Sequence, residues 1–510
     1  MARFKLVDMS PRFLPVVFEE QLVPGTFEFA LHTLIDSEFD LSALEAKFKN
    51  DETGAPAYDP AVMLKIVLLA YSRGLVSSRS IEQVCAQNVL FMAISGDSKP
   101  AYTTIAAFVR GLGREITSIF TEVILVCDRQ GLIGRRMFAI DGVKLPGNAS
   151  KARSGTHEEL AHRARAIEQR VKTLLKAHRE QDAKERGKAA AMPLDTQAQQ
   201  INALKAQAKT IRRFLRTQPK RQSAGGTERK SNLTDNDSAK MATAKGVIQG
   251  YTGAAAVDEH DQIIVAAQAH GSGSEQSLLL PMVEQARPFA SAQTIMTADA
   301  GYHSEQNLQE LDDKSIPALI ADAQMRKRDE RFKDQGKYKA LPDPLYNKGA
   351  RATKVSHGKF KPNDFSYDPD ANACICPAGK DLYSNGSQCT TGGRMCHRFT
   401  GAKRDCVPCK LREKCLRTPG TTEVRHVTFF QKDARHNKYT EAMRKRIDSP
   451  QGRALYGRRI ATVEPVFGNL RYNKGLDRFT LRGKAKVDTQ WKLYCLVHNI
   501  EKLAHSGYAQ

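Results

Sequence analysis

Residues 136–141 have the sequence RMFAID, a short apolar run that ends on an acid. A run of this kind predicts a buried β-strand, here with Asp141 at its carboxyl end. The run QTIMTA at 293–298 has the same form and is followed by Asp299. Since open α/β sheets bind ligands beyond the carboxyl ends of their strands, the two acids are candidates for one site.

Further strands and helices surround these two runs in the sequence. Strands are predicted at 251–257, 262–269 and 316–320, and helices at 277–290 and 304–312. The first two of these strands are joined by a tight turn at 258–261. The order predicts an α/β core that a long segment interrupts after its first strand.

The regions outside this core differ in composition. Residues 1–130 contain short amphipathic helices and tight turns, and they predict an N-terminal helical domain of helix-turn-helix type, which either binds DNA or serves only as a scaffold. Residues 151–239 are basic and rich in Ala and Gln, which indicates a helical insertion that is either solvated or in contact with DNA phosphates. The core strands are assigned to 131–150 and 240–325, a Cys-rich insertion to 326–430, and a C-terminal helical part of the core to 431–510.

The overall charge favours a polyanionic partner. The 510 residues include 78 Lys and Arg against 56 Asp and Glu, a formal net charge of +22. Clustered basic side chains gain free energy by releasing counterions from phosphates, so nucleic acid is the expected partner. We expect no transmembrane helix and no secretory signal, and therefore a cytoplasmic location, associated with the nucleoid when DNA is bound.

A third acid, Glu464, lies in the helical stretch RRIATVEPVFGNLRY among Arg458, Arg459 and Arg471. Phosphodiester chemistry by two metal ions needs several carboxylates around a pair of divalent cations. Pro465 directly follows Glu464, and a proline inside a helix usually breaks or kinks it. We therefore expect Glu464 at a kink or in the first turn of a new helix.

Five local sequences, spread over most of the chain, resemble DDE transposases of bacterial insertion sequences. They are AIDGVKLPGNAS, SNLTDNDSAKM, GYTGAAAVDE, TADAGYHSEQN and VEPVFGNLRYNKGLDRFTLRG. The resemblance implies an RNase H-like catalytic core in which Asp141, Asp299 and Glu464 are catalytic and hold two Mg²⁺ (or Mn²⁺). Relatives often have a Tyr, an Arg, the Glu and a basic residue separated by two, three and six residues. Here Tyr456, Arg459, Glu464 and Arg471 have intervals of two, four and six.

The resemblance implies a transposase that cleaves DNA and transfers strands at the terminal inverted repeats of its own element, into target DNA, as a homodimer on DNA. The residues expected to contact DNA are Lys144, Tyr456, Arg458, Arg459 and Arg471. Two other functions remain open: a sequence-specific, zinc-containing DNA-binding protein derived from a transposase, and an RNase H-like nuclease that does not join strands.

Seven of the ten cysteines lie between residues 374 and 415. In a reducing cytosol they are poor candidates for disulfides. The pairs Cys374-x-Cys376 and Cys406-x2-Cys409, followed by Cys415, resemble a zinc-binding segment of some of these transposases. A structural Zn²⁺ is expected on four of these five thiolates, with unliganded loop cysteines as the alternative. Cys389, Cys396 and His397 are further candidates.

Overall fold

The computed structural model describes residues 15–48, 56–185, 194–222, 226–243, 246–332, 359–386, 389–391, 394–430 and 438–508. The chain is mixed α/β and divides into two compact units, which are described separately below. The larger unit comprises residues 1–325 and 443–510, and the smaller one residues 326–442. Within the described ranges, no helix combines the length and the apolar character that crossing a membrane requires.

The larger unit begins with a set of helices. These are α1 (Phe18–Gln21), α2 (Phe27–Ser37), α3 (Ser42–Glu45), α4 (Pro60–Ser72), α5 (Ser78–Gln87), α6 (Val89–Ser95), α7 (Tyr102–Gly111) and α8 (Glu115–Arg129). The most buried is α4, which starts where Asp59 caps the backbone N–H of Ala61 at 2.7 Å and Pro60 takes the first helical position. It ends at Gly74, whose φ of +71° suits a residue without a Cβ. The short helices predicted from the sequence are therefore present.

The last helix of the chain, α17 (Lys484–His505), ties these helices to the sheet. It packs on α2, α4 and α8 and on strand β8 (Ile264–His270). Trp491 is fully buried and donates its indole N–H to the carbonyl of Ala254 at 2.9 Å. The side chain of Asn499 bonds both the N–H and the carbonyl of Ile264, each at 2.9 Å. Because these bonds satisfy the buried polar groups, α17 is held in one position on the sheet.

The central sheet contains six strands in the order β10-β9-β1-β7-β6, with β8 also paired to β7. The remaining strands are β1 (Met137–Pro146), β6 (Ala239–Thr243), β7 (Gly246–Asp258), β9 (Ile295–Ala298) and β10 (Ala318–Ile320). Strand β7 is antiparallel to β1, β6 and β8, whereas β9 is parallel to both β1 and β10. The helices α11 (Leu279–Ala286) and α12 (Glu305–Asp313) connect the later strands. All five predicted strands are confirmed, and β6 was not predicted.

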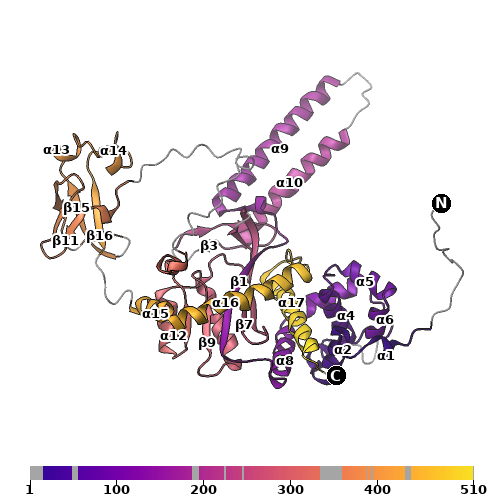
Figure 1. The fold of residues 1–510 in the computed structure, drawn as a ribbon. Helices are drawn as coiled ribbons and strands as arrows, with labels where there is room; N and C mark the ends of the chain where they lie inside the picture. The colour runs from indigo at the N-terminus through magenta and orange to yellow at the C-terminus, as the bar shows by residue number, and fades with distance from the viewer. Residues whose placement is uncertain are drawn as a thin grey trace, which may run out of the picture. The chain divides into compact units, whose positions relative to one another are not determined.

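The basic segment after β1 forms a helical hairpin. Helices α9 (His157–Glu185) and α10 (Leu194–Thr217) lie side by side (Figure 1) and pack around Leu160, Ala164 and Ile211. Short strands at its base are β2 (Ser154–Gly155), β3 (Arg221–Gln222), β4 (Glu228–Arg229) and β5 (Ser231–Asn232). Most other described side chains of the hairpin are at least partly exposed, as its charged composition predicts.

The helix that carries Glu464 continues through Pro465, so the expectation that a new helix starts there was wrong. Helix α15 (Lys438–Asp448) is followed by α16 (Pro450–Gly468), which passes through Pro465 and ends in a π-helical turn, Asn469–Asn473. A proline leaves the carbonyl four residues earlier, that of Ala461, without its helical donor. The side-chain amide of Gln262 donates to this carbonyl at 3.2 Å. A hydrogen bond from the β7–β8 turn thus replaces the missing one.

The smaller unit is a β-sheet with two short helices (Figure 1). Its strands run in the order β11-β12-β13-β15-β14, with β16 paired to β15. They are β11 (Ser366–Asp368), β12 (Ala373–Ile375), β13 (Asp381–Ser384), β14 (Cys389–Thr391), β15 (Arg394–Gly401) and β16 (His426–Phe430), with helices α13 (Lys403–Cys406) and α14 (Arg412–Cys415). Phe365, Phe399 and Val427 form its small core. Such a core is modest for an independent unit.

Candidate active site and cysteine pocket

The pairing of β1 with β9 brings Asp141 and Asp299 together. In this parallel register Ile140 lies beside Ala298, so the two acids are the next residues on neighbouring strands. Asp299 follows the last residue of β9, and Asp141 lies within β1 where its pairing to β9 ends. The two carboxylates are close enough that the charge on Asp299 raises the pKa of Asp141.

Asp141 is held by two hydrogen bonds. Its Oδ1 accepts from the backbone N–H of Gly142 at 2.8 Å, and its Oδ2 accepts from Nη1 of Arg459 at 2.9 Å. Burial raises the pKa of Asp141, and the charge of Asp299 adds to this effect, while Arg459 and the Gly142 N–H oppose it. Arg459 therefore acts as an internal counter-ion for the acid.

Tyr302 lies beneath the two acids. Its side chain is fully buried, and its hydroxyl has no hydrogen-bond partner within the described part of the chain. Burial raises its pKa well above the ordinary value, and the charges of Asp141, Glu275 and Asp299 raise it further. The hydroxyl is therefore surrounded by three carboxylates, of which Glu275 was not expected from the sequence.

Glu464 lies on α16 and lines the same cleft as Asp141. This cleft has a volume of about 940 Å³, and its other polar lining residues include Lys144, Glu275 and Arg471. The Glu464 side chain is exposed. Its helix packs against β1, β7 and β9, which places an acid from the distant end of the chain beside the strand acids.

The other residues of α16 that were expected to contact DNA differ in environment. Arg459 is engaged with Asp141, and its guanidinium lies 5.7 Å from the ring centre of Tyr456. Burial raises the pKa of Tyr456, Arg459 lowers it, and Asp299 and Asp141 raise it. Arg458 is half exposed and forms an ion pair with Glu259. One turn of the helix thus presents one buried and one exposed arginine.

Lys144 and Arg471 also line the cleft. The Nζ of Lys144 lies 2.9 Å from Oε1 of Glu275, and both side chains are largely buried. Arg471 belongs to the π-helical turn after α16, and its guanidinium lies 5.7 Å from the ring centre of Tyr472. Tyr472 itself is 79% exposed. An exposed aromatic ring beside a basic side chain is suited to contact with nucleic acid.

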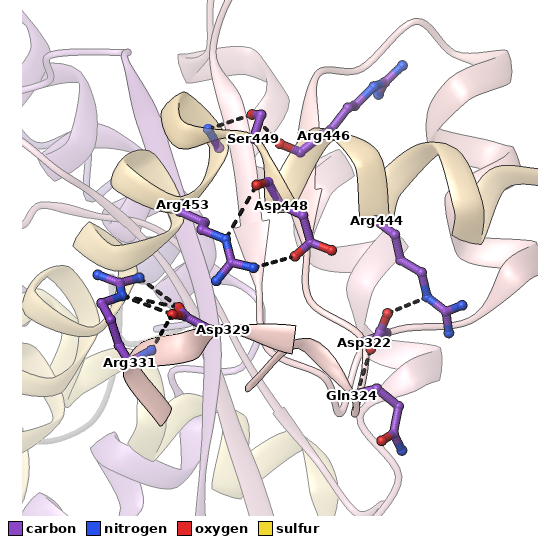
Figure 2. Close-up of polar contacts among 10 residues, drawn as sticks. Asp322, Gln324, Asp329, Arg331, Arg444, Arg446, Asp448, Ser449 and Arg453 are labelled. Carbon is purple, nitrogen blue, oxygen red and sulfur yellow. Dashed lines mark hydrogen bonds and ion pairs between the residues drawn. The ribbon is translucent and has the colours of Figure 1, made fainter. Parts of the chain in front are cut away.

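The acid that follows the next parallel strand has a different role. Asp322 lies two residues after β10, where its Oδ2 accepts from Nε of Arg444 at 2.6 Å and its Oδ1 from the N–H of Gln324 at 2.6 Å (Figure 2). Nearby, Arg453 donates to Asp448 at 3.1 Å. These pairs link α15 and α16 to the end of the sheet. An acid at a strand end can therefore be structural.

The donor chemistry of the cleft suits Mg²⁺ or Mn²⁺, because carboxylate oxygens are the ligands that these hard cations prefer. Across the ranges described, however, no three His, Cys, Asp or Glu side chains come together closely enough to hold a metal ion. Asp141 and Asp299 are adjacent through their strands, whereas Glu464 shares only the cleft with Asp141.

In the smaller unit, four cysteines line one narrow pocket of about 40 Å³. They are Cys376, Cys406, Cys409 and Cys415. Burial raises the pKa of Cys415, Arg425 lowers it, and the other three thiols raise it. The N–H of Lys380 donates to the Sγ of Cys376 at 3.4 Å. These four thiols are the set favoured by spacing, but among the described residues they too fall short of a preformed metal cluster.

The remaining cysteines of this region lie elsewhere. Cys374 is buried in the core beside Leu382 and does not line the pocket. Cys389 and Cys396 face each other across β14 and β15, and the Cys396 thiol donates to the carbonyl of Cys389 at 3.2 Å. His397 bonds Asn372 at 3.1 Å. The structure thus separates four pocket cysteines from the others.

Two family descriptions match the chain. Residues 375–504 match the transposase DDE domain, and residues 16–111 match a transposase domain of the type DUF772. Together the two matches support a DDE-type transposase of an insertion sequence. The DDE-domain match contains Glu464 and the four pocket cysteines of this transposase, whereas Asp141 and Asp299 lie before it. No curated protein matches the sequence.

Two residues at the cleft of this transposase were missed in the sequence. Tyr302 is part of the TADAGYHSEQN segment, but nothing in that segment indicates a buried hydroxyl. Glu275 ends the segment GSGSE, which directly follows β8. The rule that selected Asp141 and Asp299, an acid after an apolar strand, also selects Glu275 if a short loop is allowed.

Proposed function

We propose that this transposase cleaves DNA and transfers strands at the ends of its own element, using Asp141, Asp299 and Glu464. The observation that carries the proposal is the arrangement of the acids. Asp299 follows the strand next to that of Asp141, and Asp141 and Glu464 line one cleft. Arg459 pairs with Asp141, and Lys144, which also lines the cleft, pairs with Glu275. The match to a transposase DDE domain favours the same reaction class.

Each residue has a stated role in this proposal. Asp141, Asp299 and Glu464 hold the divalent cations, and Arg459 orients the Asp141 carboxylate and keeps it ionised. When bound, a pair of Mg²⁺ (or Mn²⁺) supplies activation of water or a 3′-hydroxyl and stabilisation of the leaving oxygen. Lys144 and Arg471 line the cleft and are assigned to DNA phosphate oxygens, and Arg458 and Tyr456 of α16 are assigned to DNA outside the cleft lining.

The strand order favours an RNase H-like core. Strands β8, β7 and β1 form an antiparallel run, followed by β9 and β10 parallel to β1. Asp141 lies within β1 where its pairing with β9 ends, and Asp299 directly follows β9. We assign the N-terminal helices and the basic hairpin to DNA binding. A homodimer would place one cleft on each end of the element.

We assign a structural Zn²⁺ to the cysteine pocket. Four thiolates fill a tetrahedron and leave no open position for water, so this site holds the fold and takes no part in the chemistry. The four thiols already face one pocket, and small side-chain movements would bring them to bonding distance. Cys374 is excluded from the ligand set because it lies in the core.

The deciding experiment is strand transfer with purified protein. Labelled duplexes from the DNA on each side of the gene are incubated with Mg²⁺ and a target plasmid. We expect joined products with the wild type and a loss of at least about a hundredfold for Asp141→Asn, Asp299→Asn and Glu464→Gln, because each variant loses a metal ligand. Binding to the duplexes should persist in all three variants.

Other outcomes would identify the alternative functions. Nicked but unjoined DNA would indicate a nuclease, and binding without cleavage a DNA-binding protein. Normal activity of Glu464→Gln would remove Glu464 from the site.

A further inference from the structure

Glu275 lies at the cleft, but neither its chain position nor the family descriptions assign it a role. It comes from the loop between β8 and α11, just before the 3-10 turn Gln276–Leu278. Its side chain is only 14% exposed. One carboxylate oxygen, Oε1, pairs with Lys144, and the position of the other oxygen is fixed by its neighbours.

The second oxygen lies close to Asp299. A Cβ built on Gly301 would lie 2.3 Å from Oε2 of Glu275 and 3.0 Å from Oδ1 of Asp299. The two oxygens are therefore at most about 5.3 Å apart, the sum of these distances. Cations in two-metal sites are roughly 4 Å apart, so carboxylates at this separation can share them.

The loop that carries Glu275 is anchored. The side chain of Gln276 donates to the carbonyl of His303 at 3.1 Å, and the carbonyl of Gln276 accepts from Asn307 at 2.8 Å. The same Asn307 amide also donates to the carbonyl of Tyr302 at 2.8 Å. One side chain thus fixes both the Glu275 loop and the tyrosine between the acids.

The buried hydroxyl of Tyr302 is an independent sign of a ligand. It lies beside the residue after Asp141, since a Cβ built on Gly142 would be 3.1 Å from the hydroxyl, and it bonds none of the described groups. A buried hydroxyl without a partner destabilises the fold, and the water of a hydrated cation near the acids would supply that partner. Four carboxylates gather here, and within the described residues ion pairs are formed by Asp141 with Arg459 and by Glu275 with Lys144, while Arg471 also lines the cleft.

We propose that Glu275 is a fourth carboxylate of the active site and binds divalent cations together with Asp141 and Asp299. In the unloaded protein Lys144 occupies its Oε1, and this lysine turns to the DNA phosphate when a cation binds. The inference rests on the proposed function, because it concerns the same cleft.

The test is Mn²⁺ binding by the full-length protein without DNA, followed by the paramagnetic resonance signal of the free ion. Glu275→Gln should weaken Mn²⁺ binding about tenfold, as expected for the loss of one partner in a metal site. Lys144→Met should leave the affinity equal or higher, because it removes a competing cation. A purely structural Glu275–Lys144 pair predicts instead that both variants weaken binding equally.

Glu501→Gln is the matched control. Glu501 also pairs with a buried lysine, Lys474, at 2.6 Å, but it lies outside the cleft. The Glu501→Gln variant should lower the melting temperature about as much as Glu275→Gln does, and it should leave the Mn²⁺ affinity unchanged. If Glu275→Gln bound Mn²⁺ within twofold of the wild type while Asp141→Asn bound it more weakly, the role of Glu275 would be refuted and the proposed function would stand. Unchanged Mn²⁺ binding and cleavage in Asp141→Asn would overturn the proposed function.

Discussion

The acid cleft and the cysteine pocket are both built from side chains that bind metals, yet they are assembled in different ways. The cleft takes Asp141, Asp299 and Glu464 from three distant parts of the chain, and a sheet register and a helix packing bring them together. The pocket takes its cysteines from residues 376–415, over two short helices and a turn.

The electrostatics differ as well. Arg459 and Lys144 neutralise carboxylates of the cleft, so the larger unit can fold without a cation. Around the pocket thiols, Arg425 is the cation that lowers the pKa of Cys415, and the neighbouring thiols raise it. The comparison teaches that ion pairs hold side chains of the cleft in place, whereas the pocket thiols have only a small core beside them.

The largest expected effect is therefore in the smaller unit. Changing Cys406 and Cys409 together to Ser should abolish zinc binding, which is worth on the order of 10 kcal/mol in small zinc domains. The wild type should retain about one zinc per chain by elemental analysis after dialysis. Limited proteolysis should then cut the variant between residues 359 and 430 while the larger unit resists.

Cys389→Ser is the control, because Cys389 lies in the β14–β15 hairpin and does not line the pocket. It should keep its zinc. If elemental analysis found no zinc in wild-type protein prepared under reducing conditions, the pocket would not be a zinc site, and the cysteines would need another explanation.

A second prediction concerns the internal counter-ion. Arg459→Ala leaves the mostly buried Asp141 carboxylate without its partner and should lower the free energy of unfolding by about 2–3 kcal/mol. Arg458→Ala, one residue earlier, removes a half-exposed pair with Glu259 and should cost no more than about 0.5 kcal/mol. Urea denaturation measures both. Equal losses would mean that the cleft is not preassembled around Arg459.

The contacts that hold α16 include a buried histidine, so the free energy of unfolding should fall at acid pH. His498 is buried, with Nε2 on the carbonyl of Gln262 and Nδ1 on the amide of Asn469 at 2.9 and 3.1 Å, and burial lowers its pKa to about 4. Between pH 6.5 and about 4 the unfolded chain binds the extra proton, so stability falls as the pH falls. Near pH 4.5 this histidine should lower the free energy of unfolding by about 2 kcal/mol relative to neutral pH.

Denaturation curves across this pH range test the effect. His498→Gln should flatten the acid-side loss of stability, whereas His260→Gln, at an exposed site, should not. An identical pH profile for wild type and His498→Gln would show that the ring is not kept neutral by burial.

The smallest effect is expected for the hairpin, which belongs to neither site. Exposed Lys172, Lys176, Lys205 and Lys209 are changed together to Gln. If the hairpin binds DNA, the slope of log affinity against log salt should decrease by about 0.9 for each phosphate that these lysines neutralise in the wild type. Filter binding over a salt series gives the slope, and circular dichroism checks the helices. An unchanged slope would leave α9 and α10 as a solvated hairpin.

The sequence by itself determined the elements and most of the chemistry. Alternating or continuous apolar runs predicted all five core strands around Asp141 and Asp299, because burial of a strand leaves a local pattern. Cysteine spacing selected five candidates, and four of them share a pocket, because short connections between them keep the side chains near one another. Such features depend on residues that are close in the chain.

Only the tertiary structure decided how α16 and the loop after β8 meet the sheet. Pro465 predicted a broken helix, yet Gln262 from another segment supplies the hydrogen bond that the proline removes. Arg459 was expected to contact a DNA phosphate, but it bonds Asp141. The carboxylates of Glu275 and Asp299 both lie beside Gly301. These contacts join residues far apart in sequence, and their free energy comes from packing and charge pairing that no local pattern encodes.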